Sequence, residues 1–231
     1  MLDFSADELT AIRLSLRVAA AATLGSLVPG ILVAYALARW RFPGKLLLDG
    51  LVHLPLVMPP VVTGYLLLVI FGRRAPVGAF LAEKLGIVLA FRWTGAALAC
   101  AVMAFPLLVR AIRLAFEATD TKLEQAAATL GAPRTVVFLT VTLPLALPGV
   151  LAGMVLGFAK ALGEFGATIT FVSNIPGETQ TLPSAIYTLL QVPGGETAAL
   201  RLVVVSAVLA FGALIASELL ARPIGRLVRG H

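Results

Sequence analysis

Charged residues are scarce in this sequence. Asp, Glu, Lys and Arg together make up only 13% of its 231 residues, against about a quarter in soluble domains. Hydrophobic residues make up 59%, and the mean hydropathy is +0.98. A chain this apolar leaves no room for a sizeable soluble domain. We therefore expect residues 1–231 to form a single transmembrane domain that is all-α and multi-pass.

Cysteine and histidine are also rare. The single cysteine, Cys100, lies in an apolar run and is expected to be a small buried hydrophobic residue. The two histidines, His53 and His231, offer no cluster of metal ligands. The Gly-rich loop ending in Lys-Ser or Lys-Thr that holds nucleotide phosphates is missing as well. The sequence therefore predicts no internal disulfide, cofactor, metal or nucleotide site.

Five apolar segments are long enough to cross a membrane, which takes about 20 residues. They cover residues 14–38, 51–72, 93–109, 145–171 and 200–220. Five spans place the two termini on opposite sides of the membrane. The architecture expected from the sequence is therefore about five transmembrane helices.

The basic residues between these spans bear on the orientation. The net charge of +6 needs no nucleic acid partner, because basic residues gather on the cytoplasmic side of membrane proteins. Arg13 and Arg17 could anchor the N-terminus inside, or extend to the outer interface. One side holds ten basic residues, Arg39, Arg41, Lys45, Arg110, Arg113, Lys122, Arg134, Arg222, Arg226 and Arg229. The other holds seven, Arg13, Arg17, Arg73, Arg74, Lys84, Arg92 and Arg201.

Three prolines interrupt the start of the second span. Pro55, Pro59 and Pro60 lie within six residues and are incompatible with an unbroken helix. One interpretation is a broken helix at membrane depth, buried in protein or lining a cavity. The other is a helix that starts near Val61 after an approach along the interface. His53 is expected at the interface.

The fourth span contains two ionisable residues. Lys160 and Glu164 are four residues apart, so an unbroken helix would stack them on one face. Ionisable residues inside a span usually face the bundle interior or a cavity. They could form a neutral pair that shapes the bundle, or they could lie beside a translocation path. Nearby Gly157, Gly163 and Gly166 favour the path, because they allow close approach.

Residues 121–134 form the longest interruption between spans, and they have helix signals of their own. Thr121 and Glu124 have the spacing of a capping box. Gly131 and Pro133 mark the helix end. A face of Leu123, Ala127 and Leu130 would be available to another surface. The alternative is an ordinary connecting helix.

At these residues the chain resembles the EAA loop of ABC-importer permeases. Gln125-Ala126-Ala127, Gly131 and the Val141–Pro144 stretch have the motif spacing, with Gln125 in place of the usual Glu and Val141 in place of Ile. Glu124 could partly supply the missing charge. The resemblance implies that a cytoplasmic loop, about 117–144, docks on an ATPase. Its contact residues would be Glu124, Gln125, Ala126, Ala127 and Gly131. The N-terminus would then lie outside and the C-terminus inside.

Other stretches are similar to the molybdate-transporter permeases over nearly the whole chain. The most specific are 163–168 (GEFGAT) and 173–179 (SNIPGET). The resemblance implies a type I ABC importer permease fold and a homodimer in the bacterial inner membrane. It also implies cytoplasmic ATPase subunits and a periplasmic or lipid-anchored molybdate-binding protein as partners. Lys160, Glu164 and Thr168 become candidates for the translocation path.

Other functions remain possible at this point. Sulfate permeases share a Gly-Glu-(Phe/Tyr)-Gly stretch, and tungstate has nearly the size and charge of molybdate. An ion-coupled secondary transporter would normally have inverted repeats, which five spans do not divide into. An intramembrane enzyme would need more than Lys160 and Glu164, which supply neither a nucleophile nor a set of metal ligands. We expect a transport subunit and not an enzyme.

Overall fold

A computed structural model describes the backbone of residues 4–229. Side chains are described up to residue 216 and at Leu219, so those of Arg222, Arg226 and Arg229, and all of His231, lie outside the described part. Within it the regular structure is helical, which confirms the expected all-α fold. The helices are α1 (Ala6–Arg39), α2 (Lys45–Val57), α3 (Pro60–Phe71), α4 (Pro76–Leu85), α5 (Trp93–Ala118), α6 (Thr121–Thr129), α7 (Arg134–Val137), α8 (Leu143–Leu162), α9 (Gly166–Val172), α10 (Leu182–Leu190) and α11 (Glu196–Arg229). A π-helical segment, Phe138–Thr142, joins α7 to α8.

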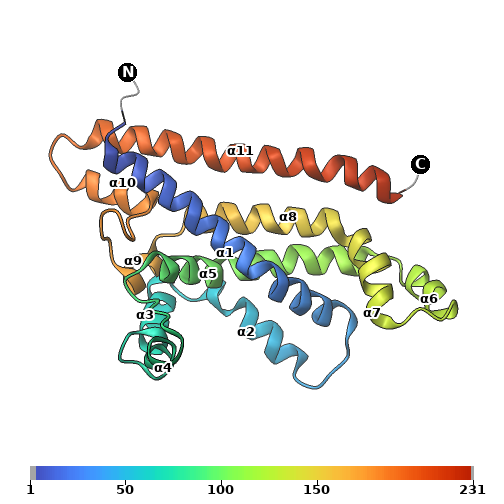
Figure 1. The fold of residues 1–231 in the computed structure, drawn as a ribbon. Helices are drawn as coiled ribbons and strands as arrows, with labels where there is room; N and C mark the ends of the chain where they lie inside the picture. The colour runs from blue at the N-terminus through green and yellow to red at the C-terminus, as the bar shows by residue number, and fades with distance from the viewer. Residues whose placement is uncertain (1–3, 230–231) are drawn as a thin grey trace.

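Three long helices form the centre of the molecule. Helix α1 lies along α5, α5 lies along α8, and α11 covers the far side of α8 (Figure 1). Small residues such as Ala19, Ala96 and Ala99 are fully buried where these helices meet. Small side chains let helix backbones approach closely, which is how membrane helices associate.

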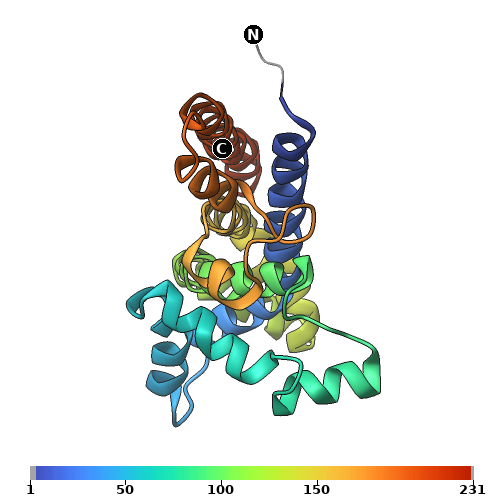
Figure 2. The same ribbon diagram turned by 90° about the vertical axis from the view of Figure 1, so that its left-hand side faces the viewer.

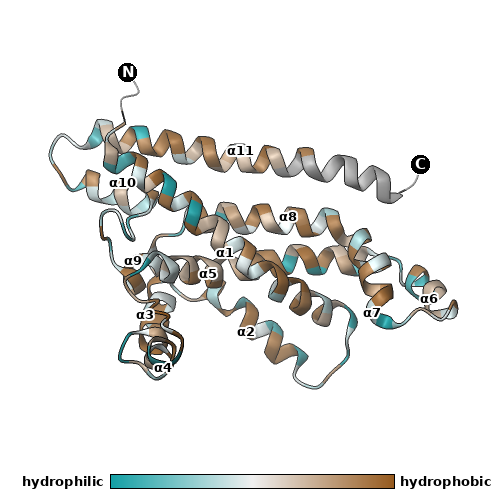
Figure 3. Cartoon of the chain, in the orientation of Figure 1, coloured by the Kyte–Doolittle hydropathy of each residue, from teal (hydrophilic) through white to brown (hydrophobic). Residues whose placement is uncertain are grey.

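Four helices in the described part are long and apolar enough to span a membrane: α1, α5, the continuous helix Arg134–Leu162, and Glu196–Ala216 of α11. Most of the coloured part of α11 is hydrophobic (Figure 3), and its residues Val204, Val208 and Phe211 are exposed. Hydrophilic residues are more frequent at the helix ends and on α6 (Figure 3). An apolar belt between polar ends is the surface that a bilayer requires.

The second predicted span, 51–72, is a bent pair of helices. Helix α2 meets α3 at an angle of 115° across Met58 and Pro59. Proline 59 precedes α3, and Pro60 occupies its first turn, where the missing N–H costs no helical hydrogen bond. Pro55 lies inside α2. The pair runs from the end of the bundle where α1 finishes to the end where α5 begins (Figure 1), so counting it as one span gives five.

The fourth predicted span, 145–171, is not one helix. Helix α8 ends at Leu162, and the chain starts a new helix, α9, at Gly166. Helix α9 packs on α3. A Cβ on Gly64 of α3 would stand 2.5 Å from the carbonyl oxygen of Ala167, so only glycine permits this crossing. The two interrupted spans therefore meet each other, while α4 lies to one side of the bundle (Figure 2).

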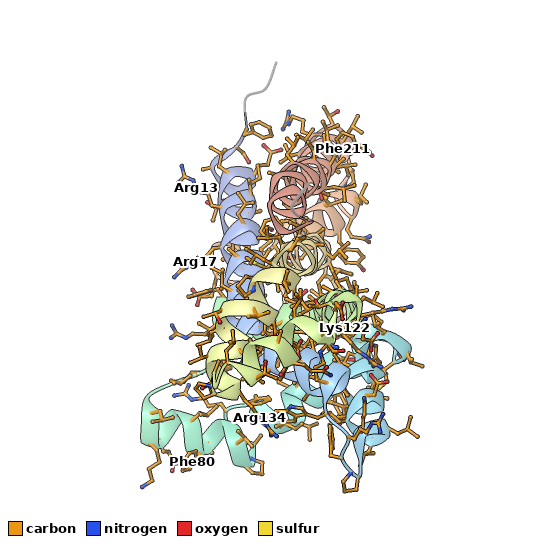
Figure 4. The ribbon with its side chains drawn as sticks, turned by 90° about the vertical axis from the view of Figure 1, so that its right-hand side faces the viewer. Arg13, Arg17, Phe80, Lys122, Arg134 and Phe211 are labelled. Atoms are coloured by element: carbon orange, nitrogen blue, oxygen red, sulfur yellow. The ribbon has the colours of Figure 1, made fainter. Side chains whose placement is uncertain are left out.

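Different helices lie at the two ends of the bundle. Helix α1 begins at one end, beside α10 and the start of α11, and α11 finishes at the other end, where α6 lies (Figure 1). Arg13 points away from the bundle (Figure 4), whereas the Arg17 guanidinium lies 3.7 Å from the centroid of the Trp93 ring at the start of α5.

This arrangement predicts that the two termini lie on opposite sides of the membrane. Epitope tags placed before Met1 and after His231 should show opposite protease accessibility in intact spheroplasts and in inverted vesicles. Digestion of both tags in the same preparation would contradict the five-span arrangement.

Candidate coupling and translocation sites

Helix α6 lies at the end of the bundle where α11 finishes (Figure 1). Its N-terminus is capped by Asp120, whose Oδ1 accepts a hydrogen bond from the N–H of Lys122 at 2.9 Å. At its C-terminal end Gly131 has φ +83°, a conformation that glycine adopts without steric cost. Pro133 then prevents the helix from continuing. The expected short helix is therefore present, with the end signals the sequence contains.

The predicted capping box is wrong. Asp120, one residue before Thr121, is the N-cap, and a carboxylate there is also favoured by the helix dipole. Glu124 faces the bundle instead, and its Oε1 accepts from Arg39 Nη2 at 2.9 Å. Its carboxylate is thus paired with Arg39 within this chain.

The surface of α6 is open. None of its residues is buried, and Gln125 and Ala126 are exposed while Ala127 is half-buried. Leu130 is 89% exposed. Leu123 of the same helix is 49% exposed, so α6 and its C-cap together expose two large apolar side chains. Figure 4 looks onto this end of the molecule and labels Lys122, which belongs to α6, and Arg134, which begins α7.

The second candidate site is the break between α8 and α9. Lys160 Nζ donates to Glu164 Oε2 at 2.6 Å, so the two predicted partners do form an ion pair. They are not stacked on one helix face, because Glu164 lies beyond the end of α8. The other carboxylate oxygen, Oε1, accepts from the N–H of Ala167 at 3.0 Å. The Glu164 side chain therefore contacts both the last turn of α8, through Lys160, and the first turn of α9, through Ala167.

The three path candidates differ in exposure. The Glu164 side chain is 2% exposed and that of Lys160 is 30% exposed. Thr168 is buried, and its hydroxyl donates to the carbonyl of Phe165 at 2.8 Å. Only Lys160 among these three offers a polar group to a passing solute.

Sequence reasoning did not single out Arg39 or Gly64. Arg39 was one of many basic residues near a span end, and a basic residue in the last turn of a helix is common. Its partner Glu124 lies 85 positions further along the chain. Gly64 has no local signal either, because its role depends on the approach of α9. The Asp120 cap was available from the sequence, since Asp is among the preferred N-cap residues.

The burial difference within the Lys160–Glu164 pair leads to a prediction. Lys160→Met should be the more damaging change because it leaves a carboxylate unpaired at 2% exposure, and breaking such a pair costs about 3–5 kcal/mol. Glu164→Gln should be milder, since Lys160 is partly exposed. The double variant should yield more folded protein than Lys160→Met, measured as monodisperse protein after detergent extraction. Equal yields for all three variants would show that the pair is of little consequence.

The comparisons with known proteins agree on one family. Residues 27–226 match the family model described as "Binding-protein-dependent transport system inner membrane component". The chain is 62% identical over 215 residues to the molybdenum transport system permease protein ModB of Escherichia coli (strain K12), covering 93% of this chain and 94% of the relative. It is 57% identical to ModB of Haemophilus influenzae over the same shares of both chains.

A solved structure supports the fold. A bacterial ABC transporter involved in the import of the acidic polysaccharide alginate superposes with a TM-score of 0.75 at 18% identity, over 96% of this chain and 82% of that one. The chain therefore has the fold of ABC importer permeases and belongs to the family of binding-protein-dependent transport system inner membrane components, among the molybdenum transport system permeases.

Proposed function

We propose that this chain is the membrane-spanning subunit of an ATP-driven molybdate importer in the bacterial inner membrane. It would work as a homodimer with cytoplasmic ATPase subunits and a periplasmic or lipid-anchored binding protein. The observation on which this proposal rests is helix α6, which stands at one end of the bundle with no buried residue. The names of the two ModB relatives, at 62% and 57% identity, support molybdate as the cargo.

Helix α6 is the proposed contact with the ATPase. Gln125, Ala126 and Ala127 present small or uncharged side chains on an open helix, which a cleft in a partner can cover closely. Leu130 adds an exposed apolar group that such a cleft would remove from water. Glu124 supports this surface from behind through Arg39, and Gly131 fixes where the helix ends.

A contact between α6 and the ATPase would decide which end of the bundle faces the cytoplasm. The α6 end, with Arg39, Arg113 and Lys122 among its basic residues, lies in the cytoplasm, as the excess of basic residues there favours. The N-terminus then lies outside, so the N-terminal tag described above should be the one digested in intact spheroplasts. Digestion of only the C-terminal tag would reverse the assignment and remove α6 from the ATPase.

Transport would proceed through a passage between two copies of the permease. ATP closes the ATPase dimer, the α6 helices pass that motion to the permeases, and the pair opens outward to accept the dianion from the binding protein. Nucleotide release returns the pair to its inward-open form. Lys160 offers one partly exposed cation near the break in the fourth span. Because Glu164 balances its charge, Lys160 would interact only weakly with a dianion, which suits release.

The coupling role predicts that a large side chain on α6 interrupts communication between the ATPase and the permease. Ala127→Trp places a large side chain on the contact surface, so binding-protein-stimulated ATPase activity and molybdate uptake should both be lost while the permease still inserts and dimerises. Reconstituted vesicles provide the measurement. Full stimulation and uptake in Ala127→Trp would mean that α6 is only a connecting helix.

Gly131→Val adds a conformational test with a matched control. No atom lies within 4 Å of a Cβ at Gly131 or at Gly86, and both glycines have positive φ. Either substitution therefore costs about 1 kcal/mol or more through the backbone alone. Gly131→Val should impair stimulation, whereas Gly86→Val, at the opposite end of the molecule, should not.

A further inference from the structure

We propose that Arg39 is the positioning residue that joins the ATPase-coupling helix to the bundle. In this view the Arg39–Glu124 ion pair passes the motion of α6 to α1, and through α1 to the body of the permease. This inference rests on the proposed function, because it assumes that α6 receives the motion of an ATPase.

The packing around α6 leaves few other attachments. Helix α6 buries none of its residues, and a cavity of about 360 Å³ separates it from the bundle. The cavity lies among α1, α6 and α7, and its lining includes Tyr35, Arg39, Gln125, Ala128 and Arg134. Helix α6 also contacts α7 and the π-helical segment Phe138–Thr142. On the side that faces α1, however, the cavity leaves a polar contact as its attachment.

One guanidinium group makes that contact. Arg39 Nη2 donates to Glu124 Oε1 at 2.9 Å and to the carbonyl oxygen of Thr119 at 3.0 Å. Arg39 is the last residue of α1, Thr119 follows the end of α5, and Glu124 lies in α6. Three helices thus meet at a single side chain.

The Arg39–Glu124 ion pair is largely buried. The side chains of Arg39 and Glu124 are only 14% and 19% exposed. An ion pair largely shielded from water is stronger and less screened by salt than one at the surface. The planar guanidinium also has donors at fixed angles, so it orients its two acceptors in a way that a lysine ammonium does not.

Helix α1 is suited to relay the movement. It has 34 residues, which corresponds to roughly 50 Å, and it packs along both α5 and α8. At its far end Glu8, with a side chain 5% exposed, pairs with Arg201 of α11 at 2.9 Å. A second ion pair therefore ties the opposite end of α1 to the outermost helix of the bundle.

The test compares Arg39→Gln, Glu124→Gln and the double variant, each reconstituted with the ATPase and the binding protein. The quantity measured is the ratio of molybdate taken up to ATP hydrolysed. Each single variant should lower this ratio by about fivefold or more, the lower range of ordinary coupling between sites. Because both changes remove one interaction, the double variant should be no worse than either single variant. Arg41→Gln removes an exposed arginine two residues away and should keep the wild-type ratio.

Insertion and dimerisation are measured alongside, so that misfolding is not taken for uncoupling. If Arg39→Gln fails to reach the membrane, Glu124→Gln decides the question alone, because the amide has the size of the carboxylate it replaces. The exchanged pair, Arg39→Glu with Glu124→Arg, should recover part of the ratio.

Two results would overturn the inference, and they are distinguishable from each other. A wild-type ratio in both single variants, together with loss in Ala127→Trp, would mean that the chain connections of α6 and its contacts with α7 and the π-helical segment transmit the motion without the ion pair. A wild-type ratio in Ala127→Trp as well would remove the coupling role of α6, and the proposed function would fail with it.

Discussion

This structure depends on the fact that the hydrocarbon core of a membrane contains no water to form hydrogen bonds with the backbone. Every N–H and C=O inside the hydrocarbon needs a partner in the protein, so an interrupted helix is tolerated only where protein surrounds the interruption. Between residues 4 and 229 the predicted spans have two such interruptions, at Met58–Pro59 and at Gly163–Phe165. Helix α3, which follows the first, packs on α9, which follows the second. Glu164 contributes directly, because its carboxylate accepts the N–H of Ala167.

A second consequence of the same constraint is the contrast between the body of the bundle and its α6 end. In the body, small residues allow the helices to approach closely, and apolar side chains cover the outside. At the α6 end, polar residues such as Asp120 and Glu124 supply the capping and the attachment that packing does not. A helix held by polar contacts and open on its outer face is suited to bind a soluble partner, which an importer permease requires.

The sequence was sufficient for the all-α class and for most of the helices, because long apolar runs predict spans whatever their packing. It was also sufficient for the end of α6, since the signals at Gly131 and Pro133 are local. It failed at the break after Leu162, because glycine is also frequent inside membrane helices, so Gly163 does not by itself mark a helix end. It failed again at Glu124. The spacing of Thr121 and Glu124 makes a capping box plausible, whereas the actual partner of Glu124 is Arg39, which only the fold brings close.

The roles of the site residues depend still less on local pattern. Thr168 was a reasonable candidate for a translocation path, yet its hydroxyl is occupied by the carbonyl of Phe165. Gly64 was not singled out, although its lack of a side chain permits α3 to cross α9. The Thr168 bond is local, reaching back only three residues to Phe165. The role of Gly64 follows from the contact between two interrupted spans, which are about 100 residues apart in the chain and whose meeting no periodicity in the sequence predicts.

The central claim is that ATP hydrolysis in a partner drives molybdate through this chain. The most direct measurement is uptake of labelled molybdate into vesicles that contain the purified permease and ATPase, with loaded binding protein outside and ATP inside. Ionophores that abolish ion gradients separate this mechanism from a secondary transporter. The account predicts uptake that requires both ATP and binding protein, persists with ionophores and resists excess sulfate. Uptake that needs an ion gradient and continues without ATP would contradict it.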